Sequence, residues 1–338
     1  MKLGKMILAT ILIIVVILGG MGTYLLQPSG QLSEFDAWQA KSNTSAEGLN
    51  VRFFGVSTLL FDDGQDQILI DGFFSRPSLW QVISSEVSSD SSLLQKIIQD
   101  HQLNRTRAIL VTHSHYDHAL DIPALAALLP RAQIIGSNST LNIARSFPDV
   151  KTSQLRRTVS GQSFQSGQFK VTPLASAHTP PTPVNDDLGE EITAPLKLPA
   201  KFSEFKEGGS FDYLIEHDRQ RILVKASTGF IPGQFKNVQA DILFLGIAQL
   251  SRQPDDYQKS YLQQTLATVK PKIVIPIHWD DFFQPLDQPL QFLPRFADNA
   301  PESMRILIKA AEAQQIQVVL LSNSQPYNLL KSASSQVP

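Results

Sequence analysis

The sequence contains no cysteine among its 338 residues and no excess of positive charge. Without cysteine, the chain forms no disulfides, offers no thiolate to a metal ion and carries no lipid-modified cysteine. The net charge is −2, with both signs mixed along the chain, so there is no basic field that would attract nucleic acid. The composition is 42% hydrophobic and 18% charged, which is typical of a globular protein with one large domain or two small ones.

One long hydrophobic run stands apart from the body of the chain. Residues 6–26, MILATILIIVVILGGMGTYLL, contain no charge and follow Lys2 and Lys5. At 1.5 Å per residue they span roughly 30 Å of hydrocarbon. The most apolar part, residues 7–18, also fits the core of a cleaved signal peptide. We favour an uncleaved anchor. In both cases the lysines predict a cytoplasmic N-terminus and a body outside the cytoplasm, either tethered in a periplasmic or extracellular position or secreted after cleavage.

The rest of the chain is predicted to form one α/β domain over residues 50–325, preceded by a linker at 27–49 and followed by a flexible tail at 326–338. Helical periodicity occurs at 91–102, 119–129, 138–146, 256–269 and 301–314. Strand-like runs occur at 51–55, 57–61, 67–72, 107–112, 132–136, 168–174, 211–217, 221–226, 241–246, 272–278 and 317–321. The early strands form hairpins and the later ones alternate with helices, which indicates two sheets covered by helices.

Residues 179–209 interrupt this pattern. The stretch is rich in proline and acidic residues and has no periodicity, and it begins immediately after His178. Aperiodic loops of about 30 residues are uncommon in compact domains and are usually lids, binding loops or disordered segments. We expect a lid over a substrate.

Three of the seven histidines fall within six positions in THSHYDH, residues 112–118. A strand-like run ends where this stretch begins, and helical periodicity resumes directly after it, so a strand-to-helix loop is predicted. His113 and His115 point the same way in an extended backbone, while Asp117 and His118 can reach a second point nearby. Imidazoles and carboxylates suit Zn²⁺, Fe²⁺ or Mn²⁺. The stretch therefore predicts a metal site.

THSHYDH resembles the His-x-His-x-Asp-His signature of the metallo-β-lactamase-fold hydrolases. The resemblance covers roughly residues 50–325 and begins with VRFFGVSTLLFDDGQDQILIDG, which is similar to the family's opening strands. Within the superfamily, the chain looks most like the ascorbate-6-phosphate lactonase-like proteins and the N-acyl-phosphatidylethanolamine phospholipase D relatives. The resemblance implies a four-layer αββα sandwich with metals at the rim between two sheets, here preceded by one hydrophobic helix.

The resemblance also implies two metal sites, with one or two Zn²⁺ ions as the cofactor and iron or manganese as alternatives. The ligands matched to the first site are His113, His115 and His178. Those matched to the second site are Asp117, His118 and His278. Asp71, at the end of QILIDG, resembles a family aspartate that orients ligands, although an aspartate before glycine is also common in turns. His101 and His217 lie in polar contexts and are left out.

One position departs from the family. Most members carry a Gly-Asp dipeptide after a strand, and its carboxylate bridges both metals. Here the corresponding residues are Ala226 and Ser227, and a neutral hydroxyl is a much poorer ligand than a carboxylate. The loss of one negative charge and one bridging contact is expected to weaken at least one site, the second before the first, and it leaves the number of ions open. Asp241 lies too far along the chain to be an obvious substitute.

The expected activity is hydrolysis of an ester, lactone, amide or phosphodiester by a metal-bound hydroxide, with Asp117 orienting the hydroxide and relaying a proton. The expected substrate is a small molecule or a lipid. Five aromatic residues adjoin the motif-bearing strand ends and line either an apolar pocket or the core: Phe73, Phe74, Trp279, Phe282 and Phe283.

Three alternatives compete with this interpretation. The Ser227 departure suits a metal-binding envelope protein of the same fold without catalytic activity. A redox di-iron protein is disfavoured because His115 stands where that class has a carboxylate. Ser203 and Lys206 fit a Ser-x-x-Lys hydrolase pattern, but the companion motifs of that class are missing.

Overall fold

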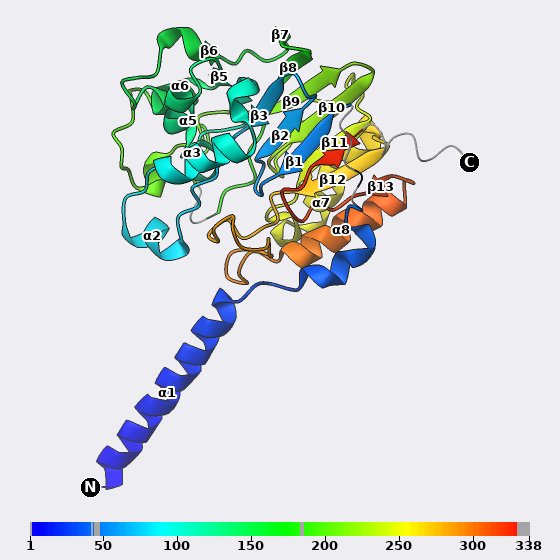
Figure 1. Ribbon diagram of the computed structural model, residues 1–338. Coiled ribbons are helices and arrows are strands. Elements are labelled where there is room, and N and C mark those ends of the chain that lie inside the picture. The colour runs from blue at the N-terminus through cyan, green and yellow to red at the C-terminus, as the bar shows by residue number, and fades with distance from the viewer. Residues whose placement is uncertain (1, 42, 44–47, 183–185, 330–338) are drawn as a thin grey trace.

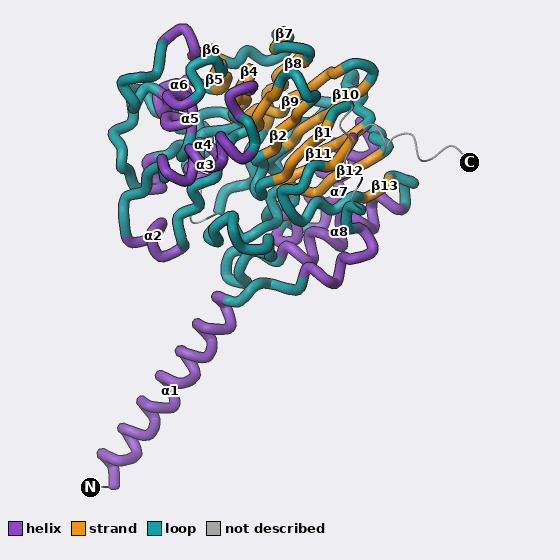
Figure 2. The backbone as a smooth tube through the Cα atoms, viewed as in Figure 1, coloured by secondary structure: helices purple, strands orange, loops and turns teal. Residues whose placement is uncertain are grey.

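The computed structural model of the protein describes residues 2–41, 43, 48–182 and 186–329. Two mixed β-sheets pack face to face, and helices cover their outer surfaces (Figures 1 and 2). This is the predicted four-layer αββα sandwich. A single long helix, α1 (Lys2–Leu26), projects away from the body (Figure 1). Its segment Met6–Leu26 is long and apolar enough to cross a membrane and is not buried against the body, although a signal sequence has the same properties.

The first sheet has the strand order β14-β1-β2-β3-β4-β5-β6. Pairing is antiparallel from β14 to β3 and parallel from β3 to β6. Its strands are β1 (Asn50–Phe53), β2 (Leu59–Asp62), β3 (Gln67–Ile70), β4 (Thr106–Leu110), β5 (Gln133–Gly136), β6 (Leu155–Arg157) and β14 (Tyr327–Asn328).

The second sheet has the order β13-β12-β11-β10-β9-β8-β7, antiparallel from β7 to β10 and parallel from β10 to β13. Its strands are β7 (Phe164–Ser166), β8 (Phe169–Ser176), β9 (Ser210–His217), β10 (Gln220–Lys225), β11 (Ile242–Gly246), β12 (Ile273–Ile277) and β13 (Gln317–Val318). Each sheet thus combines an antiparallel half with a parallel half.

Short helices follow several strands. They are α2 (Leu79–Ser84), α3 (Ser91–Asp100), α4 (Tyr116–Ala119), α5 (Ile122–Leu128), α6 (Asn138–Ala144), α7 (Asp255–Leu262) and α8 (Ala300–Glu312). The 3₁₀ turns are η1 (Leu32–Trp38), η2 (Leu103–Arg105), η3 (Thr152–Gln154), η4 (Phe202–Glu204) and η5 (Leu250–Arg252), and η6 (Gln263–Ala267) is a π-helical turn. Residues of α3, α5 and α6 pack on the first sheet, whereas residues of α7 and α8 pack on the second.

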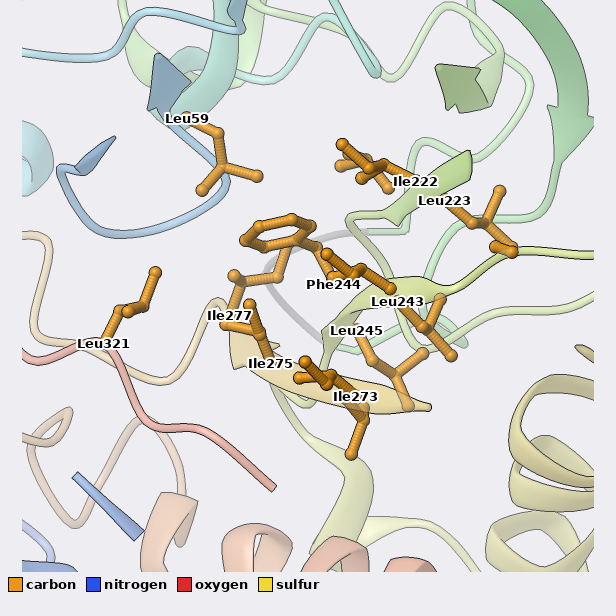
Figure 3. Packing of buried hydrophobic residues seen from close by; sticks show 14 of the residues in the cluster. Leu59, Ile222, Leu223, Leu243, Phe244, Leu245, Ile273, Ile275, Ile277 and Leu321 are labelled. Atoms are coloured by element: carbon orange, nitrogen blue, oxygen red, sulfur yellow. The ribbon is translucent and has the colours of Figure 1, made fainter. Parts of the chain in front are cut away.

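The core lies between the sheets because the central strands are apolar along their whole length. All five residues of β11 and of β12 are buried, as expected for strands covered on both faces. Phe244 of β11 points toward Leu59 of β2 (Figure 3), and its ring centroid lies 5.5 Å from that of Phe61. The contact joins the two sheets and fixes their relative position.

Each predicted strand and helix has a counterpart, but the ends of the body differ from the prediction. The segment predicted as a linker includes η1, where Phe35 is buried and contacts the ring of Phe292 at 5.6 Å. The segment predicted as a tail includes β14, which pairs with β1, and residues 330–338 lie outside the described residues. Strands β6, β7 and β14 were missed because two or three residues are too few to show periodicity.

Candidate metal centre

The site lies where three strands, β4, β8 and β12, end. His113 and His115 follow β4, and the next residues form the single turn α4, which carries Asp117 and His118. His178 follows β8, and His278 follows β12. Because each side chain comes from just beyond a strand, ligands far apart in sequence meet at one rim of the sandwich. The structure brings all six predicted ligands together in two groups of three.

The first group contains His113, His115 and His178, whose candidate ligand nitrogens lie within 4.8 Å of one another. Their ring centroids are 4.6 to 4.9 Å apart and the rings stand steeply to one another, so the imidazoles surround a common point and do not stack. Nε2 of His113 is buried and has no hydrogen-bond partner among the described residues. Leaving a buried polar atom unpaired costs about 1–3 kcal/mol, which metal coordination offsets.

The second group is centred on the carboxylate of Asp117. Its Oδ2 lies 3.5 Å from Nε2 of His118 and 3.5 Å from Nε2 of His278. With bonds of about 2.0–2.2 Å in tetrahedral geometry, adjacent ligand atoms of a zinc site are about 3.4 Å apart. Nε2 of His118 is also buried and has no hydrogen-bond partner in the described part of the chain. The donor set and spacing of both groups therefore fit a divalent metal ion.

A hydrogen-bond network orients the second group. Oδ2 of the fully buried Asp71 lies 2.8 Å from Nδ1 of His118, which turns the opposite nitrogen of that ring toward Asp117. The Ser57 hydroxyl donates to Asp71 and lies 3.0 Å from His118, and the backbone N–H of Thr112 also donates to Asp71. Asp71 thus has the position expected of an orienting residue.

The backbone at this rim is strained. Val56, Asp71 and His278 have φ of 51°, 55° and 58°, in the left-handed region that costs residues other than glycine about 1–3 kcal/mol. The His278 N–H donates to the Val56 carbonyl (2.6 Å), and the Val56 N–H donates to Asp280 (2.6 Å). Asp280 is in turn held by a buried ion pair with Arg76 (2.8 Å). This chain of contacts fixes His278 in place.

Asp187 is a residue of the site that the sequence did not reveal. It lies in the aperiodic loop, and its Oδ1 is 3.0 Å from Nε2 of His115, while its Oδ2 accepts from the Glu207 N–H. A carboxylate on the outer nitrogen of a ligating histidine fixes the ring and raises its basicity. The only signal in the sequence was the acid-rich stretch shortly after His178.

The aperiodic loop is held against the body. Its residues Ile192, Ala200 and Phe205 are buried in the core beside the first sheet. Ile192 also accepts from Asn142 and donates to Ser139. The described part of the loop, residues 186–209, is therefore packed against the body, and its role as a lid over a substrate stays a prediction.

The segment with Ser227 reaches the site, but its side chain supplies no carboxylate. The N–H and hydroxyl of Thr228 both donate to the Thr179 hydroxyl, directly after His178. A Cβ atom at Gly229 would come within 1.9 Å of the His178 carbonyl oxygen. The backbone at Gly229 therefore passes directly beside His178 of the first group, in a space too small for a side chain. Asp241, by contrast, accepts from Arg221 and pairs with Lys272.

Burial and neighbouring charges set the protonation of the site. Burial, together with the surrounding imidazoles, holds the pKa of His113 well below 6.5. Burial and the neighbouring His115 lower the pKa of His178 to about 3. Burial opposes charge on both Asp117 and His278, but their mutual contact lowers the pKa of Asp117 and raises that of His278. His113 and His178 are therefore neutral at pH 7, as metal-binding histidines must be.

Comparison with known proteins identifies the family. Residues 66–279, well over half of the chain, match the model of the β-lactamase superfamily domain. The chain belongs to this family. Membership assigns it to the metal-dependent hydrolases and confirms the predicted superfamily, while the predicted subgroup stays a prediction. No curated protein sequence matches the chain.

Solved structures with the same fold cover most of the chain. The metallo-β-lactamase-fold protein YhfI from Bacillus subtilis has a TM-score of 0.52 and 13% identity, covering 83% of this chain and 99% of its own. An isothiocyanate hydrolase from Delia radicum gut bacteria has a TM-score of 0.51 and 12% identity, with coverage of 83% and 98%. CmlA, a diiron β-hydroxylase from Streptomyces venezuelae, has a TM-score of 0.51 and 12% identity, with coverage of 85% and 55%. At such identities the likeness shows the fold alone.

The other candidate residues lie apart from the two groups. Phe73, Phe74 and Trp279 are fully buried and belong to the core. Ser203 is exposed, and Lys206 pairs with Glu190 at 2.8 Å, so the two do not form a nucleophile and base. His217 is buried against Asp63, and His101 packs on the ring of Phe54.

Changing Asp187 to Asn is expected to weaken zinc binding by about 10–100-fold, because His115 loses the charged partner that orients it. Zinc competition with a chromophoric chelator measures the dissociation constant. The matched control is Asp186→Asn, which alters an exposed neighbour and should bind zinc as the wild type does. Equal affinity of the Asp187 variant and the control would contradict this role.

Acid should destabilise the metal-free protein through His178. The unfolded residue takes up a proton below its ordinary pKa of 6.5, whereas the folded residue stays neutral down to about pH 3. The unfolded state then binds more protons, so stability is lost as the pH falls from 6.5 toward 3. The urea midpoint in EDTA, measured against pH, should fall less steeply in His178→Gln than in the wild type. Parallel curves would rule out this contribution.

Proposed function

We propose that this protein is a membrane-anchored metal-dependent hydrolase whose body lies outside the cytoplasm and which cleaves an ester, lactone, amide or phosphodiester bond. One observation carries the proposal: two groups of three ligands meet at one rim, and the Asp117 carboxylate lies within reach of both histidines of the second group.

The two groups of residues that would hold the ions differ in how complete their ligand sets are. His113, His115 and His178 complete a three-histidine site of the kind that binds Zn²⁺ in hydrolytic enzymes. The second group has one carboxylate, Asp117, and Ser227 lacks the bridging oxygen that the family usually provides. We therefore propose one tightly bound ion, preferably Zn²⁺, and a second that binds more weakly; iron and manganese suit the same ligands.

A divalent ion held there would activate a water at neutral pH and polarise the bond to be cleaved. The protein's own residues do the rest. Asp117 stays ionised because its pKa is lowered by His118 and His278. It would orient the attacking water toward the substrate, take up a proton from that water, and pass the same proton to the leaving group.

Half-buried aromatic side chains beside the ligands indicate a substrate with an apolar part. The ring of Phe282 lies 6.0 Å from that of His278 and 6.4 Å from that of Tyr116. The ring of Phe202, from the aperiodic loop, also lies 6.0 Å from the ring of Tyr116. A lipid or another cell-envelope molecule suits these walls, and so does a small ester with an apolar group.

The proposal of a membrane anchor is supported by α1 and by the contacts at its junction with the body. The apolar segment Met6–Leu26 has 21 residues, about 31 Å of helix, and lysines precede it. At its far end, Arg295 lies 4.5 Å from the ring of Tyr24, and its N–H donates to the Gln27 carbonyl. Basic and aromatic residues are enriched where a membrane helix leaves the hydrocarbon.

Replacing Asp117 with Asn is expected to lower the hydrolytic rate by about 10²–10⁴-fold, because the amide cannot accept the proton. Zinc-loaded protein is first screened on a panel of esters, lactones, amides and phosphodiesters, and the best substrate is then used for both variants. The first metal group should still retain zinc, which elemental analysis checks.

The matched control is Asp256→Asn, which removes a carboxylate that is 99% exposed and belongs to neither ligand group, and which should leave the rate unchanged. Full activity in the Asp117 variant would overturn the proposed mechanism. A metal-loaded wild type that hydrolyses nothing in the panel would favour the non-catalytic metal-binding alternative.

A further inference from the structure

Helix α2 (Leu79–Ser84) carries two large apolar side chains on its outer face. Trp80 is 72% exposed and Ile83 is 59% exposed, whereas Val82 packs inward. Positions three apart lie on the same side of a helix, so the two side chains form one patch. The Ser78 hydroxyl caps the helix by accepting from the Gln81 N–H, so the patch sits on an ordered turn. Burying each of these side chains would gain about 1.5–3 kcal/mol.

The patch lies on the side of the body from which α1 leaves. Figure 1 shows α2 at the lower edge of the body, level with the end of α1. The Phe296 side chain, 40% exposed, lies at that edge too, because its N–H donates to the Leu25 carbonyl at the end of the anchor. A membrane surface at the end of α1 would therefore contact both the patch on α2 and the Phe296 side chain.

A lipid surface fits this patch better than a protein partner. Stable protein interfaces bury more than about 1,000 Å² in total, far more than two side chains on a six-residue helix provide. Tryptophan is enriched at membrane–water interfaces, where its ring is half in hydrocarbon and its N–H is hydrated. Residues 77–85, PSLWQVISS, carry no charge, so no charged side chain in them would be dehydrated on contact.

We propose that the outer face of α2, through Trp80 and Ile83, docks into the lipid interface beside α1. This inference rests on the membrane anchor of the proposed function and adds a second point of contact. With α1 as the single point of contact the body can rotate about the helix, whereas a second contact through α2 fixes which side of the body faces the membrane.

Docking would turn the rim that carries the candidate metal ligands toward the lipid. The segment from His278 to Phe296 runs from a ligand to the end of the anchor, with Phe282 against His278 on the way. In Figure 1 this segment, in orange, loops along the same lower edge as α2. A substrate leaving the bilayer then meets the aromatic walls of the site without crossing water.

The test uses tryptophan fluorescence of the full chain in phosphatidylcholine nanodiscs, with and without bromine on the acyl chains, because bromine quenches tryptophan only at close range. The chain has three tryptophans, and the other two, Trp38 and Trp279, are partly or fully buried in the body. Brominated lipid should quench the wild type, and Trp80→Phe should lose that quenched component.

The matched control adds Val159→Trp to Trp80→Phe. Val159 is 51% exposed between β6 and β7, at the opposite end of the body from α1 (Figure 1), and its tryptophan should escape quenching. Equal quenching of the wild type and Trp80→Phe, or quenching at position 159, would overturn the docking. Shielding of Trp80 from both brominated lipid and aqueous acrylamide would also overturn it, since that result indicates a protein partner or a second copy.

Incorporation into the nanodisc separates this inference from the proposed function. A chain that incorporates but shows no Trp80 quenching retains its anchor and loses only the docked orientation. A chain that fails to incorporate lacks the anchor itself, and docking fails with it. Zinc content and hydrolysis are measured on the same samples and test the metal site independently.

Discussion

The contact of the Asp117 carboxylate with His118 and His278 is the constraint on which the rest of the rim depends. Asp117 and His118 come from α4, which follows β4 of the first sheet, and His278 follows β12 of the second sheet. They meet at 3.5 Å because the two sheets pack face to face. Buried imidazoles with unpaired nitrogens are costly, and the protein accepts that cost together with strained backbone at three positions. Such an arrangement is stable when a metal ion completes it.

Apolar periodicity in the sequence was enough to predict most of the fold, and the resemblance carried by THSHYDH pointed to the six residues that the structure groups at one rim. The ligands follow apolar runs that end abruptly, and parallel strands bring such ends to one rim. Contacts between distant segments were not predictable in this way. Asp187 contacts His115 across 72 residues, from a loop without periodicity, and the Ser57–Asp71–His118 network depends on the packing of three segments. Strand β14 was missed because its two residues gain order only by pairing with β1.

Three exposed apolar features of the molecule lie near one another. Helix α1, the patch on α2 and Phe296 lie on one side of the body, and a segment of the chain leads from there directly to a ligand, His278. The aromatic walls at Phe202 and Phe282 give that side an apolar approach to the metals. These features are the reason why we propose a membrane-anchored body and a substrate with an apolar part.

The most direct test of the account is the zinc stoichiometry of the wild type and of Ser227→Asp after equilibration with a chelator of moderate affinity. The wild type has a complete three-histidine group and a second group without the bridging carboxylate. The account predicts one retained ion per chain in the wild type and two in Ser227→Asp, which restores that carboxylate. Two equally retained ions in the wild type, or none, would contradict it.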